Sequence, residues 1–221
     1  MGFVEIEEIR DRWNREAQAF DDIYGSRSRS MNLVNRLMRK AVLQRYELAL
    51  SSLTPAQGAT VLDVGCGSGV YAEAFLKLPI ASYTGVDVSD AMLALASSRT
   101  ADAQAKEKLE LVCADFVEWQ TDQTFDYTIA MGVFDYSSNP EALIRKMASL
   151  TNKRISISLP TQSKARIRSS LRRFRYRIFG KGDVYYYTEP DVRGLQDAAG
   201  ASSVSVKDLG SGQGYFICLD F

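Results

Sequence analysis

Residues 61–69 read Val-Leu-Asp-Val-Gly-Cys-Gly-Ser-Gly, and this stretch decides the fold. A hydrophobic strand runs directly into a loop with glycine at positions 65, 67 and 69, so the loop has the pattern G-x-G-x-G. Glycine has no Cβ and readily adopts positive φ, so such a loop can turn sharply and let a ligand approach its backbone. We therefore predict a pocket for a nucleotide-like ligand at the end of this strand.

The loop differs from the dinucleotide-binding fingerprint G-x-G-x-x-G. That pattern would require glycine at position 70, where this chain has Val70. Asp63 lies two residues before the first glycine, where a negative charge would not help to bind a phosphate but would suit a positively charged ligand. A tight strand-to-helix connection without a ligand is the alternative for the glycine loop taken alone.

Acidic or glycine-rich residues follow three further predicted strands. The predicted strand 82–88 has Asp87 near its carboxyl end, about 20 residues beyond the first glycine, where a nucleotide-binding fold places the carboxylate that binds the ribose hydroxyls. Strand 109–113 is followed by Ala114-Asp115-Phe116, and strand 125–131 by Gly132-Val133-Phe134-Asp135-Tyr136. In open α/β sheets, ligands bind at the carboxyl ends of strands, near the point where the strand order reverses. These groups therefore predict a single site.

Residues 58–160, with these motifs, resemble the class I S-adenosylmethionine-dependent methyltransferases, whose cofactor carries a sulfonium and an ammonium group but no phosphate. The resemblance implies a Rossmann-like α/β sheet of seven mainly parallel strands with helices on both faces, an N-terminal helical lid, and S-adenosyl-L-methionine as cofactor. It implies cofactor-binding roles for Asp63, Gly65, Gly67, Gly69, Asp87, Met92, Asp115, Phe116, Met131 and Tyr24.

Several of these residues also have structural interpretations. The resemblance places Met92 on the adenine face and Asp115 on the exocyclic amine of the adenine. Core packing is the alternative for Met92, and a surface turn is the alternative for Asp115. For Asp87 the alternative is a helix N-cap, although Ser89 is better placed to cap the predicted helix 90–98.

The chain contains no histidine, which removes the commonest general base and the commonest metal ligand. Proton abstraction would then fall to a carboxylate, a phenol, a lysine or water. The candidate catalytic residues are Asp135 and Tyr136, because in the related methyltransferases the exit of the fourth strand faces the transferable methyl group. A helix cap is the alternative for Asp135, although Asn139 is better placed before Pro140. No metal site is predicted.

We expect a single domain with four parts: an N-terminal helical lid (1–52), a cofactor-binding core (58–160), a basic insertion (161–189), and a C-terminal helix and hairpin (190–221). Apolar residues at three- and four-residue steps predict helices around 6–17 and 33–48. Further predicted elements are a strand at 154–159, a helix at 190–199, and strands at 202–208 and 215–220.

The polar segment 20–30 is predicted as a loop that resembles the lid of several methyltransferases. The resemblance implies that Tyr24 reaches the methionine part of the cofactor and that Arg27 or Arg29 binds its carboxylate. The alternative is a solvated loop that does not contact the cofactor. The segment also resembles methyltransferases of tetrapyrrole carboxylates, too loosely to name a substrate.

Residues 164–181 contain eight lysines and arginines and no acidic residue. An apolar stripe at helical spacing predicts an amphipathic helix with Arg168, Arg172 and Arg175 on one flank. Arginine suits carboxylates and phosphates, so we predict that these three residues bind an anionic acceptor. Peripheral contact with an anionic membrane and a merely solvated face are the alternatives.

Composition narrows the choice of partner and compartment. With 27 basic and 27 acidic residues, no overall field attracts the protein to nucleic acid or membrane. Its three cysteines form no C-x-x-C pair, and no N-terminal apolar run indicates a signal peptide, so we expect a cytoplasmic protein. The exit of the fourth strand lacks the Asn-Pro-Pro-Tyr type of motif of base-amine methyltransferases, which argues against a nucleic-acid substrate.

These observations predict S-adenosylmethionine-dependent methyl transfer to a small or lipid-linked anionic acceptor, at an oxygen atom. An RNA methyltransferase and a non-catalytic S-adenosylmethionine-binding protein are the alternatives. The identity of the acceptor and the oligomeric state are left open.

Overall fold

The computed structural model describes residues 2–24, 33–101, 107–161, 185–210 and 214–221. For residues 2–5, 19–24 and 33–41 the description covers the helical backbone. The three predicted acceptor-binding arginines, Arg168, Arg172 and Arg175, lie outside the described residues, as does the whole basic segment 164–181.

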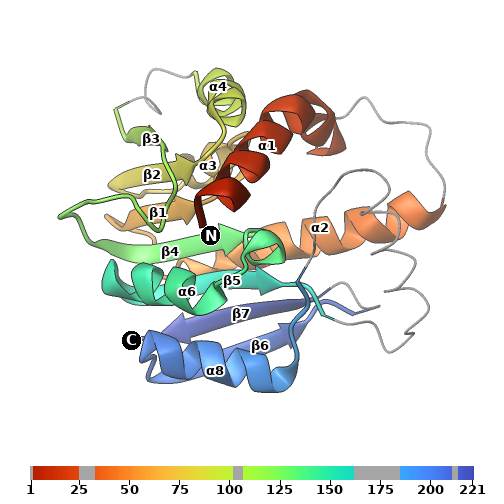
Figure 1. The fold of residues 1–221 in the computed structure, drawn as a ribbon. Coiled ribbons are helices and arrows are strands. Elements are labelled where there is room, and N and C mark those ends of the chain that lie inside the picture. The colour runs from red at the N-terminus through yellow and green to blue at the C-terminus, as the bar shows by residue number, and fades with distance from the viewer. Residues whose placement is uncertain (1, 25–32, 102–106, 162–184, 211–213) are drawn as a thin grey trace.

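One seven-stranded sheet forms the centre of the protein, with the strand order β3-β2-β1-β4-β5-β7-β6 (Figure 1). Its strands are β1 (Thr60–Val64), β2 (Ser82–Asp87), β3 (Leu109–Cys113), β4 (Phe125–Met131), β5 (Thr151–Leu159), β6 (Ser203–Asp208) and β7 (Tyr215–Asp220). The first five strands are parallel, and β7 runs antiparallel to both β5 and β6. This confirms the predicted seven-stranded, mainly parallel sheet. The order reverses between β1 and β4, whose carboxyl ends are therefore the expected place for a ligand.

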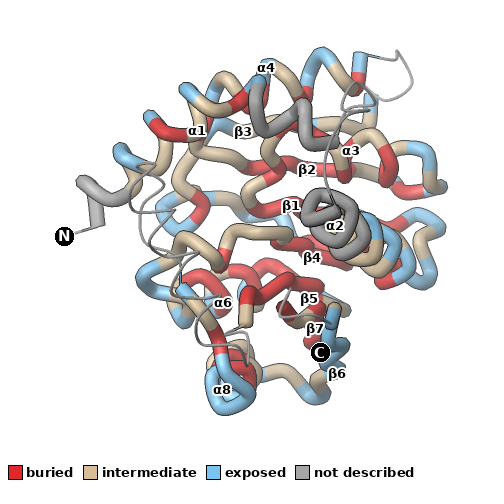
Figure 2. Tube along the Cα trace, turned by 90° about the vertical axis from the view of Figure 1, so that its right-hand side faces the viewer, coloured by how far each residue is buried: buried red, intermediate tan, exposed pale blue. Residues whose placement is uncertain are grey.

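Helices cover both faces of this sheet. The described helices are α1 (Gly2–Tyr24), α2 (Leu33–Ser52), α3 (Val70–Phe75), α4 (Asp90–Arg99), the 3-10 helix η1 (Phe134–Tyr136), α6 (Pro140–Ser149) and α8 (Glu189–Ala199). One core cluster packs α6 and α8 against the sheet, and a second packs α2 and α3 against it. Figure 2 shows buried residues along the strands between these layers. Because β1 and β4 are buried on both faces, they read as nearly continuous apolar runs, which is why the sequence located them correctly.

Two predicted boundaries were wrong. Helix α1 continues to Tyr24, so residues 20–24 are helical where a loop was expected. Phe20 and Tyr24 continue the three- and four-residue spacing of the apolar stripe, and the acidic pair between them does not interrupt it. Strand β5 begins at Thr151, three residues earlier than predicted, because Thr151 already pairs with Phe125 of β4 and Phe125 N–H donates to Leu150 O at 2.7 Å. None of the described helices is long and apolar enough to cross a membrane.

Candidate active site

The three glycines of the loop between β1 and α3 all have positive φ, at 68°, 54° and 74°. Their surroundings differ. A Cβ on Gly65 would overlap the side chain of Val133, and a Cβ on Gly69 would lie 2.8 Å from Ala96 Cβ in α4. A Cβ on Gly67 would meet no atom within 4 Å, because Gly67 faces a cavity. Gly65 and Gly69 therefore allow neighbouring residues to pack closely against the backbone of the loop. Gly69 does not line the cavity, whereas Gly67 lines it and leaves space for a ligand.

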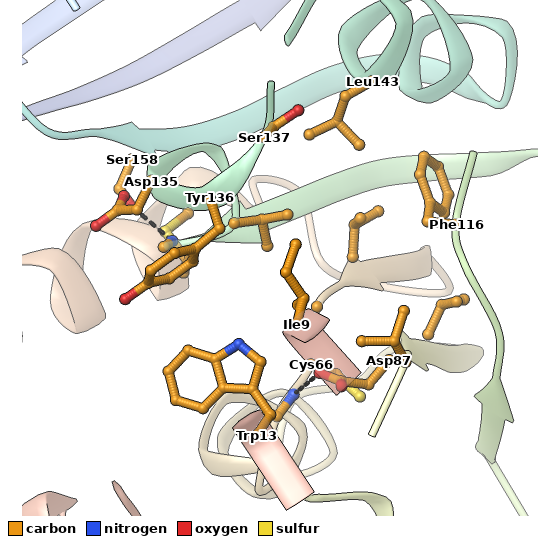
Figure 3. A pocket seen from close by; sticks show the side chains of 18 of the residues that line it. Ile9, Trp13, Cys66, Asp87, Phe116, Asp135, Tyr136, Ser137, Leu143 and Ser158 are labelled. Atoms are coloured by element: carbon orange, nitrogen blue, oxygen red, sulfur yellow. Dashed lines mark hydrogen bonds between the residues drawn. The ribbon is translucent and has the colours of Figure 1, made fainter. Parts of the chain in front are cut away.

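Asp87 lies at the end of β2 in the cavity wall, opposite Gly67. Its Oδ2 accepts a hydrogen bond from Gly67 N–H at 2.8 Å (Figure 3). Its Oδ1 accepts one from Ser89 N–H at 2.9 Å. Burial raises the pKa of the carboxyl, and these backbone N–H groups act in the opposite direction. Each oxygen of a carboxylate can accept a second hydrogen bond, so Asp87 can bind ligand hydroxyls while it holds the loop. The cap of α4 is Ser89, whose Oγ accepts from Met92 N–H at 3.1 Å, so the N-cap alternative for Asp87 was wrong.

Asp63 does not line the cavity, although we expected it to bind the cofactor. Its carboxyl is 1% exposed, accepts a hydrogen bond from the Tyr83 hydroxyl, and lies outside the cavity wall. Burial, with a smaller contribution from the charge of Asp87, raises the pKa of Asp63 to about 8. The neutral carboxyl is therefore the main form at neutral pH. Asp63 supports the strand behind Gly65 instead of presenting a negative charge to the ligand.

This pKa predicts how stability changes with pH. Between the ordinary value of 3.8 and about 8, the folded protein keeps a proton on Asp63 that the unfolded chain releases, so the free energy of unfolding falls as pH rises through this range. Asp63→Asn keeps an acceptor for Tyr83 and cannot ionise. We expect its Tm to exceed that of the wild type at pH 8 by about 2–4 °C or more, corresponding to about 1 kcal/mol or more, and the gain to shrink toward pH 4.

Thermal melts at several pH values test this expectation, with Asp126→Asn as the control of opposite sign. The pKa of Asp126 is lowered, mainly by its hydrogen bond with Lys153, so its contribution is present at neutral pH and is lost on acidification. Asp126→Asn should therefore destabilise the protein at pH 8. A gain for Asp63→Asn that is equal at pH 4 and pH 8 would contradict the assignment to Asp63.

Four other predicted cofactor residues line the same cavity: Met92, Asp115, Phe116 and Met131. Met92 is 2% exposed, so it is both a core residue and part of the wall. Asp115 Oδ1 accepts from Val117 N–H at 3.0 Å, so the turn predicted as its alternative is also present. Phe116 is buried and packs against Trp119, with ring centroids 6.3 Å apart. Tyr24 is the last residue of α1, and its side chain lies outside the described residues.

The cavity has a volume of about 1040 Å³. This is slightly above the range of about 300–1,000 Å³ that is typical of a small-molecule site. Beyond the predicted residues, its wall includes parts of α1, α2, the end of β5 and the β6–β7 hairpin. These added residues include Ile6, Ile9, Trp13, Val42, Arg45, Ser158, Leu159, Pro160, Leu209 and Tyr215.

Helix α1 covers one side of this cavity. Arg10 Nε donates to Val88 O at 3.2 Å, and Asn14 Oδ1 accepts from Ser89 Oγ at 2.5 Å, so α1 is attached to the residues that follow β2. The cover over the described site is therefore α1 itself; residues 25–30 of the predicted lid loop lie outside the described residues.

The candidate catalytic residues Asp135 and Tyr136 lie in η1, directly after β4, and both line the cavity. The cap of α6 is Asn139, which accepts from Ala142 N–H at 3.1 Å, so Asp135 is not the helix cap. The rings of Trp13 and Tyr136 meet edge to face with centroids 5.6 Å apart (Figure 3). The buried guanidinium of Arg12 lies 4.9 Å from the Trp13 ring centroid and 4.7 Å from that of Tyr136.

Arg45 was missed by sequence reasoning. It is one of several basic residues in α2, and nothing in its local sequence distinguishes it from the others. In the fold it lines the cavity, and a Cβ on Gly132 would lie 3.7 Å from Arg45 Nη1. The structure therefore places a guanidinium beside the exit of β4. Among the residues described, no group of three potential metal ligands was found.

The strand order, the glycine loop and the carboxylate after β2 agree with the class I S-adenosylmethionine-dependent methyltransferase fold that the sequence predicted. Residues 61–154 match the family model described as "Methyltransferase domain".

The chain is also similar in sequence to curated proteins that are named as O-methyltransferases. The chain is 26% identical over 142 residues to malonyl-[acyl-carrier protein] O-methyltransferase of Priestia megaterium, covering 63% of this chain and 45% of that protein. It is 28% identical over 102 residues to ubiquinone biosynthesis O-methyltransferase of Albidiferax ferrireducens, covering 46% of this chain and 40% of that protein. The chain thus spans about half the length of the curated relatives it matches.

Among solved structures, magnesium protoporphyrin IX methyltransferase from Synechocystis PCC 6803 with bound SAH aligns with a TM-score of 0.73 and 21% identity. The alignment covers 98% of each chain. At this identity the likeness shows a shared fold.

Proposed function

We propose that the protein transfers the methyl group of S-adenosylmethionine to an oxygen atom of a small or lipid-linked acceptor that carries negative charge. The observation that carries this proposal is the cavity itself. Gly67, Asp87 and the exit of β4 meet in its wall, and its volume of about 1040 Å³ leaves room for an acceptor beside the cofactor.

The residues present fit the cofactor. The open side of Gly67 leaves the space that a Cβ would fill, and Asp87 has acceptor capacity for the ribose hydroxyls. Met92 and Phe116 provide apolar surface for the adenine, and Asp115 adds an acceptor for its amine.

The carboxylate of the methionine part needs a cation. In the described wall the cationic side chains are Arg10 and Arg45. Arg10 donates to Val88 O beside the ribose position, whereas Arg45 lies beside Gly132 at the exit of β4. We therefore assign the carboxylate to Arg45.

Catalysis in this proposal is mainly positioning. The bound sulfonium supplies an activated methyl group, so the protein's task is to hold the acceptor oxygen in line with it. Tyr136 and Asp135 follow β4 and contact the acceptor; Asp135 either orients an acceptor hydroxyl or takes its proton. The O-methyltransferase names of the malonyl-acyl-carrier-protein and ubiquinone relatives support an oxygen acceptor.

Two measurements test the proposed function. Calorimetry should show binding of S-adenosylmethionine and of its demethylated product, S-adenosylhomocysteine (SAH), and no binding of NAD. Labelled methyl groups should then pass from the cofactor to a metabolite extract and not to RNA. Binding of NAD alone would overturn the cofactor assignment, label in RNA would favour the nucleic-acid alternative, and cofactor binding without any transfer would favour a non-catalytic protein.

Whether the acceptor is lipid-linked is tested separately, by sedimentation with liposomes that contain or lack anionic lipid. A surface helix held by arginines should bind only the anionic liposomes. The segment proposed for this contact, residues 164–181, lies outside the described residues. If the protein sediments with neither type of liposome, the soluble form of the acceptor is favoured.

A further prediction concerns Arg12, whose guanidinium packs against Tyr136 from behind the cavity wall. Cation–π contacts that are shielded from water contribute about 1–2 kcal/mol. Arg12→Met should therefore lower kcat/KM for the labelled acceptor by roughly 5–30-fold and leave cofactor affinity nearly unchanged. Arg12→Lys should recover part of the loss.

Steady-state kinetics check this expectation, with Arg15→Met as the control, because Arg15 is an exposed residue of the same helix. If Arg12→Met and Arg15→Met have the same kcat/KM, Arg12 does not position Tyr136. An equal loss of cofactor affinity in Arg12→Met would instead show that it holds α1 as a whole.

A further inference from the structure

Ser158 lies in the cavity wall near the end of β5, a position to which the sequence drew no attention. In the parallel pairing of β4 and β5 it is the partner of Met131, so it is level with the exit of β4. The residue is 5% exposed. Figure 3 labels it among the side chains that line the cavity together with Asp135 and Tyr136.

The hydrogen bonds of Ser158 are incomplete. Its Oγ accepts a hydrogen bond from Gly132 N–H at 2.9 Å. A serine hydroxyl has two acceptor lone pairs and one donor hydrogen, so this bond leaves the hydrogen available. Within the described part of the chain, no group accepts it. Buried donors normally have a partner, so a ligand atom with a free lone pair is the natural complement.

The surroundings of Ser158 indicate the chemistry of that ligand. Leu159, Pro160 and Leu209 line the wall near this end of the sheet with apolar surface, and the Arg45 guanidinium lies beside the Gly132 backbone to which Ser158 is bonded. Arg45 is assigned to the cofactor carboxylate, but its guanidinium has five N–H donors and one bidentate carboxylate uses only two of them. A hydroxyl donor beside these remaining donors, in an apolar wall, suits an oxygen anion attached to an apolar body. An ammonium group, the form of a primary alkylamine at neutral pH, would bring further donors to this position and would leave the hydroxyl hydrogen without an acceptor.

We propose, building on the proposed function, that the methyl acceptor is a carboxylate and that Ser158 donates a hydrogen bond to one of its two oxygens. The other oxygen is the one methylated. It forms a bond to the methyl carbon as the carbon–sulfur bond breaks, and the electron pair of that bond stays on sulfur. The carboxylate becomes a neutral ester and the sulfonium becomes a neutral thioether. No proton is transferred, so Asp135 does not act as a base in this reaction, which agrees with a chain that contains no histidine.

The test uses three probes with the same ring and different head groups: benzoate, phenol and benzylamine. Their dissociation constants are measured by ligand-observed NMR with protein saturated with SAH. Wild-type protein should bind benzoate more tightly than phenol or benzylamine. Loss of one hydrogen bond to a charged group should weaken benzoate binding by about tenfold in Ser158→Ala. Ser158→Thr keeps the hydroxyl and should restore the affinity.

Ser156→Ala is the matched control. Ser156 is a buried serine two residues earlier on the same face of β5, where its Oγ pairs with Cys218 Sγ at 3.5 Å, and it does not line the cavity. Its benzoate affinity should equal that of the wild type. Affinity for SAH should stay within about twofold of wild type in all three variants, which also shows that they are folded.

Equal benzoate affinity in wild type and Ser158→Ala would overturn the role of Ser158, and wild-type preference for phenol or benzylamine would overturn the carboxylate. A joint loss of SAH and benzoate binding in Ser158→Ala would assign the serine to the cofactor or to the support of Gly132. Failure of the wild-type protein to bind SAH would instead contradict the proposed function, and the Ser158 assignment would fall with it.

Discussion

Replacing Gly67 with leucine is expected to abolish binding of S-adenosylmethionine while the fold survives. Gly67 has a φ of 54°, and a Cβ built on it meets no atom within 4 Å, so the protein itself has space for a side chain there. That space is the cavity, and the leucine would occupy the position of the ligand. The backbone strain of a left-handed residue costs about 1–2 kcal/mol, which lowers stability without preventing folding. Calorimetry measures the affinity and thermal melting measures the stability.

Gly58→Leu is the matched control for this strain. Gly58 has a φ of 69°, a Cβ on it also meets no atom within 4 Å, and it lies outside the cavity wall. Both variants should lose a similar amount of stability, but only Gly67→Leu should lose cofactor binding. If Gly67→Leu binds the cofactor as well as Gly58→Leu does, the loop is a strand-to-helix connection and not a binding loop.

Asp87→Ala is expected to weaken cofactor binding by about 1.5–3 kcal/mol, which corresponds to roughly 10–150-fold in Kd. The reason is the loss of charged hydrogen-bond acceptors for the ribose hydroxyls. Asp87 also holds Gly67 N–H at 2.8 Å and Ser89 N–H at 2.9 Å, so a moderate decrease in Tm is expected as well. Titration calorimetry and thermal melting separate the two effects.

Asp126→Ala provides the comparison for Asp87. Asp126 is also a carboxylate that accepts from a backbone N–H, that of Thr60 at 3.0 Å, but it does not line the cavity. This variant should lower Tm without changing cofactor affinity. If Asp87→Ala behaves in the same way, with a large decrease in Tm and wild-type affinity, Asp87 is structural and the ribose assignment is wrong.

The sequence by itself determined the central part of the fold and several residues of the cavity wall. Strands β1 and β4 are mostly apolar, because parallel strands with both faces covered have few polar positions. The boundaries of β1 to β4 were predicted to within one residue. The G-x-G-x-G loop and Asp87 were also recognisable, because each directly follows a strand and depends on residues close in the chain. Asp63 was recognised by the same pattern, but its role was misjudged, since burial behind the loop is a property of the packed sheet.

Only the tertiary structure decided which side chains complete the cavity. Arg12, Arg45 and Ser158 come from α1, α2 and β5, and each acquires its role from a partner far away in the chain: Tyr136 for Arg12, and Gly132 for the other two. Basic residues of a helix look alike in sequence, and which of them reaches a ligand depends on how the helix packs on the sheet. Position 69 is a further example of a requirement that the local sequence does not reveal. A side chain there would collide with Ala96 of a different helix, so the position requires glycine. A local sequence pattern predicts the conformation of the segment that contains it. The contacts of these residues form only when the helices pack against the sheet.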